Sequence, residues 1–152
     1  MTIQFRYHDA AEMVRWAEER ISGCRFRDDA TAIGMERAGS LAAVVVYDTF
    51  SPSNCFVSLA AAERHWFTHE FAIRAMAYPF VQCRFTRINC LISSNNRLSL
   101  TFTRQFGWRQ EGVLREAGAD GEDVLVFGML RRECRYLSRA FGGAGKFRAL
   151  TV

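Results

Sequence analysis

Hydrophobic and polar positions alternate along the chain in a way that predicts helices and strands in turn. The first amphipathic stretch follows Asp9 and places apolar side chains on one helical stripe: Met13, Trp16, Ala17 and Ile21. Asp9 and Glu12 have the spacing of a capping box, in which a side chain accepts from a free N–H group of the first turn. A helix is therefore expected to begin just after Asp9.

Three strand-like runs follow this helix. Thr31–Arg37 and Leu41–Thr49 are separated by the compact turn Ala38–Ser40, which predicts a β-hairpin. Ser51–Asn54 is a cluster of turn-forming residues, and the apolar run Cys55–Ala61 comes directly after it. We expect these runs to form neighbouring strands of one sheet.

The middle of the chain contains two more helical patterns. Apolar residues at helical spacing predict a central helix over Trp66–Val81, disturbed near its end by Pro79. Thr86–Ile92 alternates like a strand, and Arg97–Phe106 reads as a helix that Gly107 ends in the left-handed conformation. A strand on each side of a helix implies that the two strands run parallel.

The last part of the chain has the pattern of another hairpin. Trp108–Arg115 and Asp123–Leu130 flank a glycine-containing loop at Ala117–Gly121. A short basic helix is expected over Arg131–Phe141. Its arginines leave two interpretations open, a solvated helix face, which is favoured, or contact with nucleic acid.

The order of elements predicts an α/β protein with a mixed, mostly antiparallel sheet that contains one parallel strand pair. No repeat, linker or second hydrophobic core is evident in the sequence. We therefore expect a single domain over residues 1–141 and a flexible C-terminal tail over residues 142–152.

Composition narrows the classes of protein but does not select a function. The chain has 152 residues, 49% hydrophobic and 24% charged, as in an ordinary soluble domain. Neither a membrane-spanning run nor a signal peptide is recognisable, so a cytoplasmic protein is expected. The net charge of +4 comes almost entirely from arginine, which suits coenzyme A, nucleic acid or an acidic protein alike.

Two patterns that can indicate metal or redox chemistry are incomplete. The five cysteines form no CxxC pair, and we interpret them as small buried hydrophobes. His65 and His69 share one helical face, but the sequence between them lacks the glutamate of the His-Glu-x-x-His pattern and no third ligand is apparent. No metal site is expected.

The most informative segment runs from Asn95 to Arg115. It contains Asn96-x-x-Ser99, then Phe106-Gly107-Trp108, then Glu111-Gly112-x-x-Arg115. This is similar to the signature of the GNAT N-acetyltransferases. Flanking matches extend the resemblance over roughly Val46 to Leu137 and point to the small members often found in phages and prophages: Trp66–Thr68, Tyr78–Gln82, Arg87–Ile88 and Gly128–Arg135.

The resemblance implies the GNAT acyl-CoA N-acyltransferase fold, with a splayed parallel strand pair and helices on both faces of the sheet. It also implies an acetyl transfer from acetyl-CoA to an amine. The pantetheine arm is expected to pair with the strand Cys55–Ala61, and the pyrophosphate to lie on the N-terminus of the next helix. These expectations assign cofactor contacts to Leu59, Ala60, Ala61, Arg64, Trp66, Phe67, Thr68, Asn96, Ser99 and Phe102.

The chain departs from the family pattern at two positions that matter for activity. The glycine-rich turn before the central helix is replaced by a turn without glycine, in which Trp66 and Phe67 leave less room for the backbone to approach a phosphate. The tyrosine that often protonates the leaving thiolate corresponds to Thr103. Ser58, Glu63 and Thr103 are the candidate catalytic residues, and the expected substrate contacts are Tyr47, Asp48, Phe50 and Asn54.

Two functional hypotheses follow. The first is an N-acetyltransferase in which an amine of unknown identity attacks acetyl-CoA directly within a ternary complex. The second is a catalytically degenerate GNAT-fold protein that binds a protein or nucleic-acid partner. A homodimer, formed through strand edges or the C-terminal segment, is compatible with either hypothesis.

Overall fold

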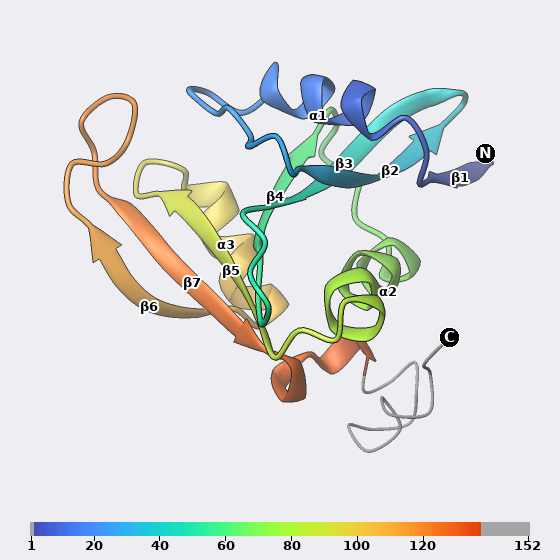
Figure 1. Cartoon of the computed structure of the whole chain (residues 1–152). Helices are drawn as coiled ribbons and strands as arrows, with labels where there is room; N and C mark the ends of the chain where they lie inside the picture. Colours follow the sequence, from blue (N-terminus) through green and yellow to red (C-terminus); the bar gives the residue numbers. More distant parts are fainter. Residues whose placement is uncertain (1, 138–152) are drawn as a thin grey trace.

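The computed structural model describes residues 2–137. The predicted tail over residues 142–152 and the second half of the predicted basic helix lie outside these residues. Within the described range, the sequence forms one mixed sheet with helices packed against it (Figure 1).

The sheet has the strand order β1-β2-β3-β4-β5-β7-β6, and seven strands take part within residues 2–137. Every neighbouring pair is antiparallel except β4 and β5, which are parallel as expected. The strands are β1 Ile3–Arg6, β2 Thr31–Arg37, β3 Ser40–Asp48, β4 Phe56–Ala61, β5 Arg87–Ser93, β6 Arg109–Leu114 and β7 Val124–Leu130.

The helices cover both faces of this sheet, which confirms the expected layering (Figure 1). Helix α1 (Ala10–Glu18) buries Met13 and Ala17 against one face, whereas α2 (His69–Ala77) and α3 (Arg97–Phe106) pack on the other. Successive side chains of β3 explain the division. Val44 and Val46 face α1, and the alternate residues Val45 and Tyr47 face the larger core cluster under α2 and α3.

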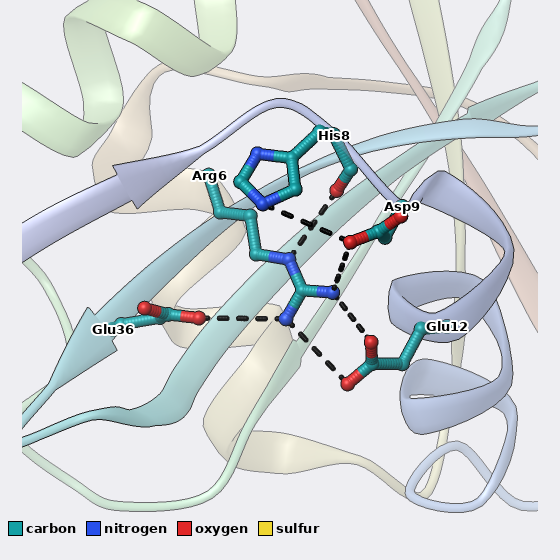
Figure 2. A network of polar contacts seen from close by, with 5 residues as sticks. All are labelled: Arg6, His8, Asp9, Glu12 and Glu36. Carbon is teal, nitrogen blue, oxygen red and sulfur yellow. Dashed lines mark hydrogen bonds and ion pairs between the residues drawn. The ribbon is translucent and has the colours of Figure 1, made fainter.

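Strand β1 was not predicted. Arg6, its last residue, connects this strand to α1 and β2 through ion pairs (Figure 2). The guanidinium contacts Glu12 of α1 at 2.5 Å, Asp9 at 3.4 Å and Glu36 of β2 at 3.4 Å. The predicted capping box is therefore wrong. Asp9 adopts a left-handed conformation without a side-chain cap bond, and the carboxylate of Glu12 binds Arg6 instead.

The Arg6–Glu12 contact predicts acid sensitivity. Hydrogen bonding from Arg6 lowers the pKa of Glu12 below its ordinary value of 4.5. A depressed carboxyl pKa stabilises the fold above the unfolded-state pKa, and that contribution disappears as the pH falls through the lowered value. Thermal unfolding between pH 7 and pH 3 should show a smaller loss of stability below pH 4.5 for Glu12→Gln than for the unmodified protein. Identical pH profiles would contradict this expectation.

Two helix boundaries differ from the sequence prediction. The central helix begins at His69 rather than Trp66, because Thr68 caps it. Pro79 lies in a π-helical continuation, Tyr78–Gln82, so the helix is disturbed near its end as predicted. After β7 the chain forms a 3₁₀ turn at Arg131–Glu133. The predicted continuous basic helix from Arg131 is therefore incorrect over its first turn.

Candidate functional site

Strands β4 and β5 pair at one end and separate at the other. Their register contains the single pair Phe56–Asn89, supported by the N–H group of Asn89, which donates to the carbonyl of Cys55 at 3.0 Å. No further β4–β5 pairing follows along the described strands, whereas β4 stays paired with β3 along its whole length. The splayed parallel pair expected from the sequence is confirmed. We call the Phe56 side its joined end and the Ala61 side its open end.

The backbone of β4 offers unpaired groups to the gap at alternate residues. The N–H group of Ala62 donates to Ala42 of β3 at 2.9 Å, and the β3–β4 register is regular, so Ala60 and Ser58 also direct their backbone groups toward β3. The backbone groups of Leu59 and Ala61 consequently point toward β5, where the strand is no longer paired. An extended ligand could add to these two residues as a strand would.

This geometry reduces the number of β4 residues that can contact a ligand in the gap. Ser58 and Ala60 use their backbone groups on β3, and their side chains lie on the α1 face of the sheet. Ser58 is half-buried on that face, whereas Ala60 is buried under α1. Of the residues predicted for β4, Leu59 and Ala61 can bind a ligand through the backbone and Ser58 only through its hydroxyl.

A short loop leads from the Ala61 end of β4 to the N-terminus of α2, which begins at His69. The hydroxyl oxygen of Thr68 accepts from the Phe71 N–H at 3.0 Å, and its carbonyl accepts from the Ala72 N–H at 3.1 Å. The first two amides of the helix, those of His69 and Glu70, are not used by this cap. Free amides at a helix N-terminus attract anions, although the carboxylate of Glu70 in the same turn opposes that attraction.

The loop between β4 and α2 is bound to β2 through Arg37. Its guanidinium forms an ion pair with Glu63 at 2.8 Å and also donates to the carbonyl of His65 at 2.5 Å. Glu63 must leave this ion pair before it can act freely as a base. Arg64, between the two anchored residues, is exposed, and among the described residues it forms no ion pair.

Trp66 and Phe67 belong to an aromatic cluster that joins the start of α2 to α3. The cluster comprises Trp66, Phe67, Phe102, Phe106 and Tyr136. Ring centroids lie 5.0 Å apart for Trp66–Phe102, 5.7 Å for Phe67–Phe102 and 4.5 Å for Phe106–Tyr136. The aromatic cluster therefore stands where the resemblance would place a glycine-rich turn, and large side chains restrict close backbone approach there.

Helix α3 places the Asn96-x-x-Ser99 motif at its first turn. The side-chain oxygen of Asn96 accepts from the Ser99 N–H at 3.2 Å, so the residue caps the helix, and the hydroxyl of Ser99 is half-buried. Gly107 ends the helix at φ 115° as predicted. Thr103 is only 5% exposed and lies in the core side of the helix. It is not positioned as an exposed proton donor.

Tyr47 and Asp48 lie at the joined end, opposite Val57 and Phe56, and not near the opening. Tyr47 is fully buried and its hydroxyl donates to the carbonyl of Ala75 at 2.5 Å. The carboxylate of Asp48 accepts from the Arg27 N–H at 3.2 Å, and burial raises its pKa. The expectation that Tyr47 faces a substrate is wrong because the sheet directs its side chain into the core.

The other two predicted substrate residues also precede the joined end. The N–H group of Phe50 donates to Asp29 at 3.0 Å, and its ring lies 6.0 Å from that of Phe85. The side-chain oxygen of Asn54 accepts from the amide of Asn89 at 2.9 Å. Both residues therefore have structural partners, and neither is brought to the open end.

Two features of the site were not predicted. Asn89, a single amide inside an apolar strand, links β5 to the segment before β4. The α1–β2 loop also meets the β6–β7 loop, since a Cβ atom at Gly23 would lie 3.1 Å from that of Ala119. A polar residue within an apolar strand was a usable signal for Asn89, whereas no local pattern indicates a contact between two distant loops.

The cysteines, possible metal-binding groups and possible membrane spans were examined over the described residues. Cys55, Cys90 and Cys134 are buried, and burial raises the pKa of the Cys55 thiol to about 12. Over residues 2–137, no group of three or more His, Cys, Asp or Glu side chains is arranged to hold a metal ion. In the same range, no helix is both long and apolar enough to span a membrane.

Solved structures share this architecture. A variant of spermidine N-acetyltransferase SpeG from Vibrio cholerae superposes with a TM-score of 0.71 at 16% identity, over 91% of this chain and 98% of that chain. A second variant gives 0.71 at 17% identity over the same shares. The spermidine/spermine N-acetyltransferase SpeG from Vibrio cholerae in complex with manganese ions also gives 0.71, at 16% identity, over 91% and 96%.

Sequence comparison adds no relative. No protein-family model matches the chain, and no curated protein matches it. The structural similarity at 16–17% identity shows a shared fold, and this is the GNAT fold expected from the sequence motifs. The matches do not bear on the phage and prophage subgroup, which stays a prediction.

Proposed function

We propose that this chain is an N-acetyltransferase that transfers an acetyl group from acetyl-CoA to an amine by direct attack within a ternary complex. The observation that carries the proposal is the open end of the β4–β5 pair. There the backbone groups of Leu59 and Ala61 face a gap in a sheet of the same fold as known N-acetyltransferases. A pantetheine arm carries amide groups that match such unpaired backbone groups.

The residues around the gap fit the donor unevenly. The strand edge at Leu59 and Ala61 suits the pantetheine arm, and the amides of His69 and Glu70 with the exposed Arg64 suit a phosphate. The aromatic cluster permits a less close approach of backbone to phosphate than glycine would. We therefore expect the pantetheine contacts to contribute more to affinity than the pyrophosphate contacts do.

The protein's contribution to the reaction is chiefly to bring two reactants together. Acetyl-CoA would supply an acetyl group activated as a thioester. Ser58, whose side chain is half-buried on the α1 face of β4, would orient the incoming amine, while Glu63 would accept a proton, directly or through water, after leaving Arg37. Thr103 is buried, so proton donation to the leaving thiolate falls to water or another group, and positioning supplies most of the rate enhancement.

The acceptor amine is not specified by these residues. Spermidine, which the names of the structural neighbours give as their substrate, is the first amine to test, followed by other small amines and protein amines. Similarity to the small members found in phages and prophages is proposed from the sequence motifs alone.

A specific observation also favours the second hypothesis. The aromatic cluster joins α2 to α3 with ring contacts of 5.0–5.7 Å at Trp66, Phe67 and Phe102, and Glu63 is held in an ion pair. Both features are expected of a GNAT-fold binding protein that does not transfer acetyl groups. Large side chains fill the turn where a phosphate would bind, and the candidate base is held in an ion pair.

Isothermal titration calorimetry with acetyl-CoA separates the two hypotheses. The unmodified protein should show saturable binding, and Arg64→Ala should raise the dissociation constant about three- to tenfold because it removes a charged phosphate donor. Arg15→Ala is the matched control, since this exposed arginine lies on α1 across the sheet. Absence of binding by folded, cofactor-free protein would refute the acetyltransferase proposal and favour the binding protein.

A further inference from the structure

The joined end of the β4–β5 pair depends on one side chain, that of Asn89. Its amide nitrogen donates to the Asn54 side-chain oxygen at 2.9 Å and to the Cys55 carbonyl at 3.1 Å. Its side-chain oxygen accepts from Nε of Arg87 at 2.7 Å. Asn89 is 8% exposed, so it is a buried polar group whose donors and acceptor are all used.

These bonds act where the backbone pairing is weakest. Asn89 is also the one β5 residue in register with β4, and its N–H group shares the Cys55 carbonyl with its own side chain. A single parallel bridge provides little cohesion between two strands. The side-chain amide adds bonds to the same carbonyl and to the turn before β4, and it thereby fixes the last point at which the strands touch.

The network continues across the sheet on the face opposite α2 and α3. Ile88 and Cys90 point into the larger core cluster, so Arg87 and Asn89 alternate to the other face. Arg87 forms an ion pair with Glu111 of β6 above Gly128, where a Cβ atom would lie 2.2 Å from a carboxylate oxygen of Glu111. Asn89 is consequently tied both to the start of β4 and, through Arg87, to β6.

We propose that Asn89 is a positioning residue that sets the point at which β4 and β5 separate, and hence how far an extended acyl donor can enter between them. The inference rests on the proposed function for its consequence, but the geometry of the separation can be tested without it. Leu59 and Ala61 begin only three and five residues beyond Phe56, so a shift of the separation point changes which backbone groups face the donor.

Asn89→Asp and Asn89→Ala separate shape from hydrogen bonding. The carboxylate keeps the size of the amide and can still accept from Arg87, but it cannot donate to Cys55 or Asn54. Alanine removes all three bonds and leaves a small cavity. Asn95→Ala is the matched control, because this exposed amide donates to Glu122 at 3.3 Å outside the β4–β5 pair.

The first measurement is amide hydrogen exchange, which needs no ligand. In both Asn89 variants, exchange of the backbone N–H at position 89 should accelerate about tenfold or more, since the side-chain hydrogen bonds to Cys55 and Asn54 are lost. The N–H groups of Ser58 and Ala60, which bond to β3, should keep their protection, and Asn95→Ala should change neither set. Equal acceleration throughout the sheet would indicate general destabilisation and would overturn the proposal.

The second measurement is steady-state kinetics with acetyl-CoA and the best acceptor amine. Both variants should raise the KM for acetyl-CoA about tenfold. The KM for the amine should remain within about twofold, a split that a general loss of folded protein would not produce. Unchanged KM for acetyl-CoA together with unchanged exchange at position 89 would overturn the role of Asn89.

Two complications can be resolved within the same design. If Asn89→Ala does not fold, Asn54→Ala removes one of the three bonds from a surface turn, and it should accelerate exchange at position 89 to a smaller extent. If the unmodified protein does not bind acetyl-CoA, the proposed function fails. The exchange experiment then still decides whether Asn89 sets the separation point.

Discussion

The Ala61→Pro variant is expected to fold and to lose about tenfold or more in affinity for acetyl-CoA. The N–H group of Ala61 faces the gap beside β4 and has no partner in the sheet, so proline removes no bond of the described fold. Proline is tolerated in a strand when its missing N–H lies on an unpaired edge. A pantetheine arm would lose one backbone bond and meet the proline ring, and about 1.4 kcal/mol corresponds to tenfold in binding.

Ala60→Pro provides the matched control one residue earlier. The backbone groups of Ala60 bond to β3, so the same substitution there removes a ladder bond inside the sheet and should lower the unfolding temperature. Calorimetric titration with acetyl-CoA and thermal unfolding of both variants test the expectation. Undiminished binding by folded Ala61→Pro would show that the donor does not pair with β4, and it would contradict the proposed binding mode.

Tyr47→Ala should produce the largest loss of stability among the changes considered. The side chain is fully buried in the core cluster, packs against Tyr78 at 4.8 Å between ring centroids and donates to the Ala75 carbonyl. Removal of a buried aromatic ring typically costs about 3–5 kcal/mol through lost transfer free energy and cavity formation. Urea unfolding should show this decrease in the free energy of unfolding with little change in the m-value.

Tyr47→Phe isolates the hydroxyl. Phenylalanine keeps the ring and removes only the hydrogen bond to Ala75, so the free energy of unfolding should fall by about 1–2 kcal/mol. Acetyl transfer by the folded variant should be unchanged, because the hydroxyl lies in the core and not at the gap. A large decrease in kcat for a stable Tyr47→Phe protein would restore Tyr47 as a site residue.

The two halves of the proposed donor site use different groups of the protein, backbone in one half and side chains in the other. The pantetheine half consists of backbone groups of β4, which depend on how the strands are arranged and not on the identity of Leu59 or Ala61. The phosphate half depends on side chains. Here the aromatic cluster stands in place of the glycines found in the family that the sequence resembles. This difference explains why the fold can be conserved at 16% identity while the details of binding remain specific to the chain.

Local signals in the sequence predicted the elements they govern. The helix Arg97–Phe106 was predicted with its observed bounds, because Asn96 supplies a cap bond and Gly107 a left-handed end. Strand Thr31–Arg37 was likewise predicted with its observed bounds next to a tight turn. Each of these boundaries is decided by residues within a few positions of it, so a pattern along the chain contains the necessary information.

Tertiary contacts replaced other local interactions that the sequence predicted. The Asp9–Glu12 spacing predicted a capping box, but Arg6 of the unpredicted β1 binds Glu12 at 2.5 Å, and an ion pair formed through tertiary contact replaced the cap. The start of the central helix moved to His69 because Trp66 and Phe67 pack on α3, which holds them out of the helix. The spacing of apolar residues favoured helix at Trp66 and Phe67, and packing overrode it.

The sequence by itself determined the mixed sheet, the parallel strand pair and the resemblance that suggests acetyl transfer, because periodicity and short motifs are properties of neighbouring residues. Only the tertiary structure decided which groups face the gap. It directs the backbone of Leu59 and Ala61 toward β5, turns Tyr47 into the core and joins Asn89 to Asn54. Strand register and the face to which a side chain points arise from pairing between distant segments, and a shift of one residue would reverse every one of these assignments.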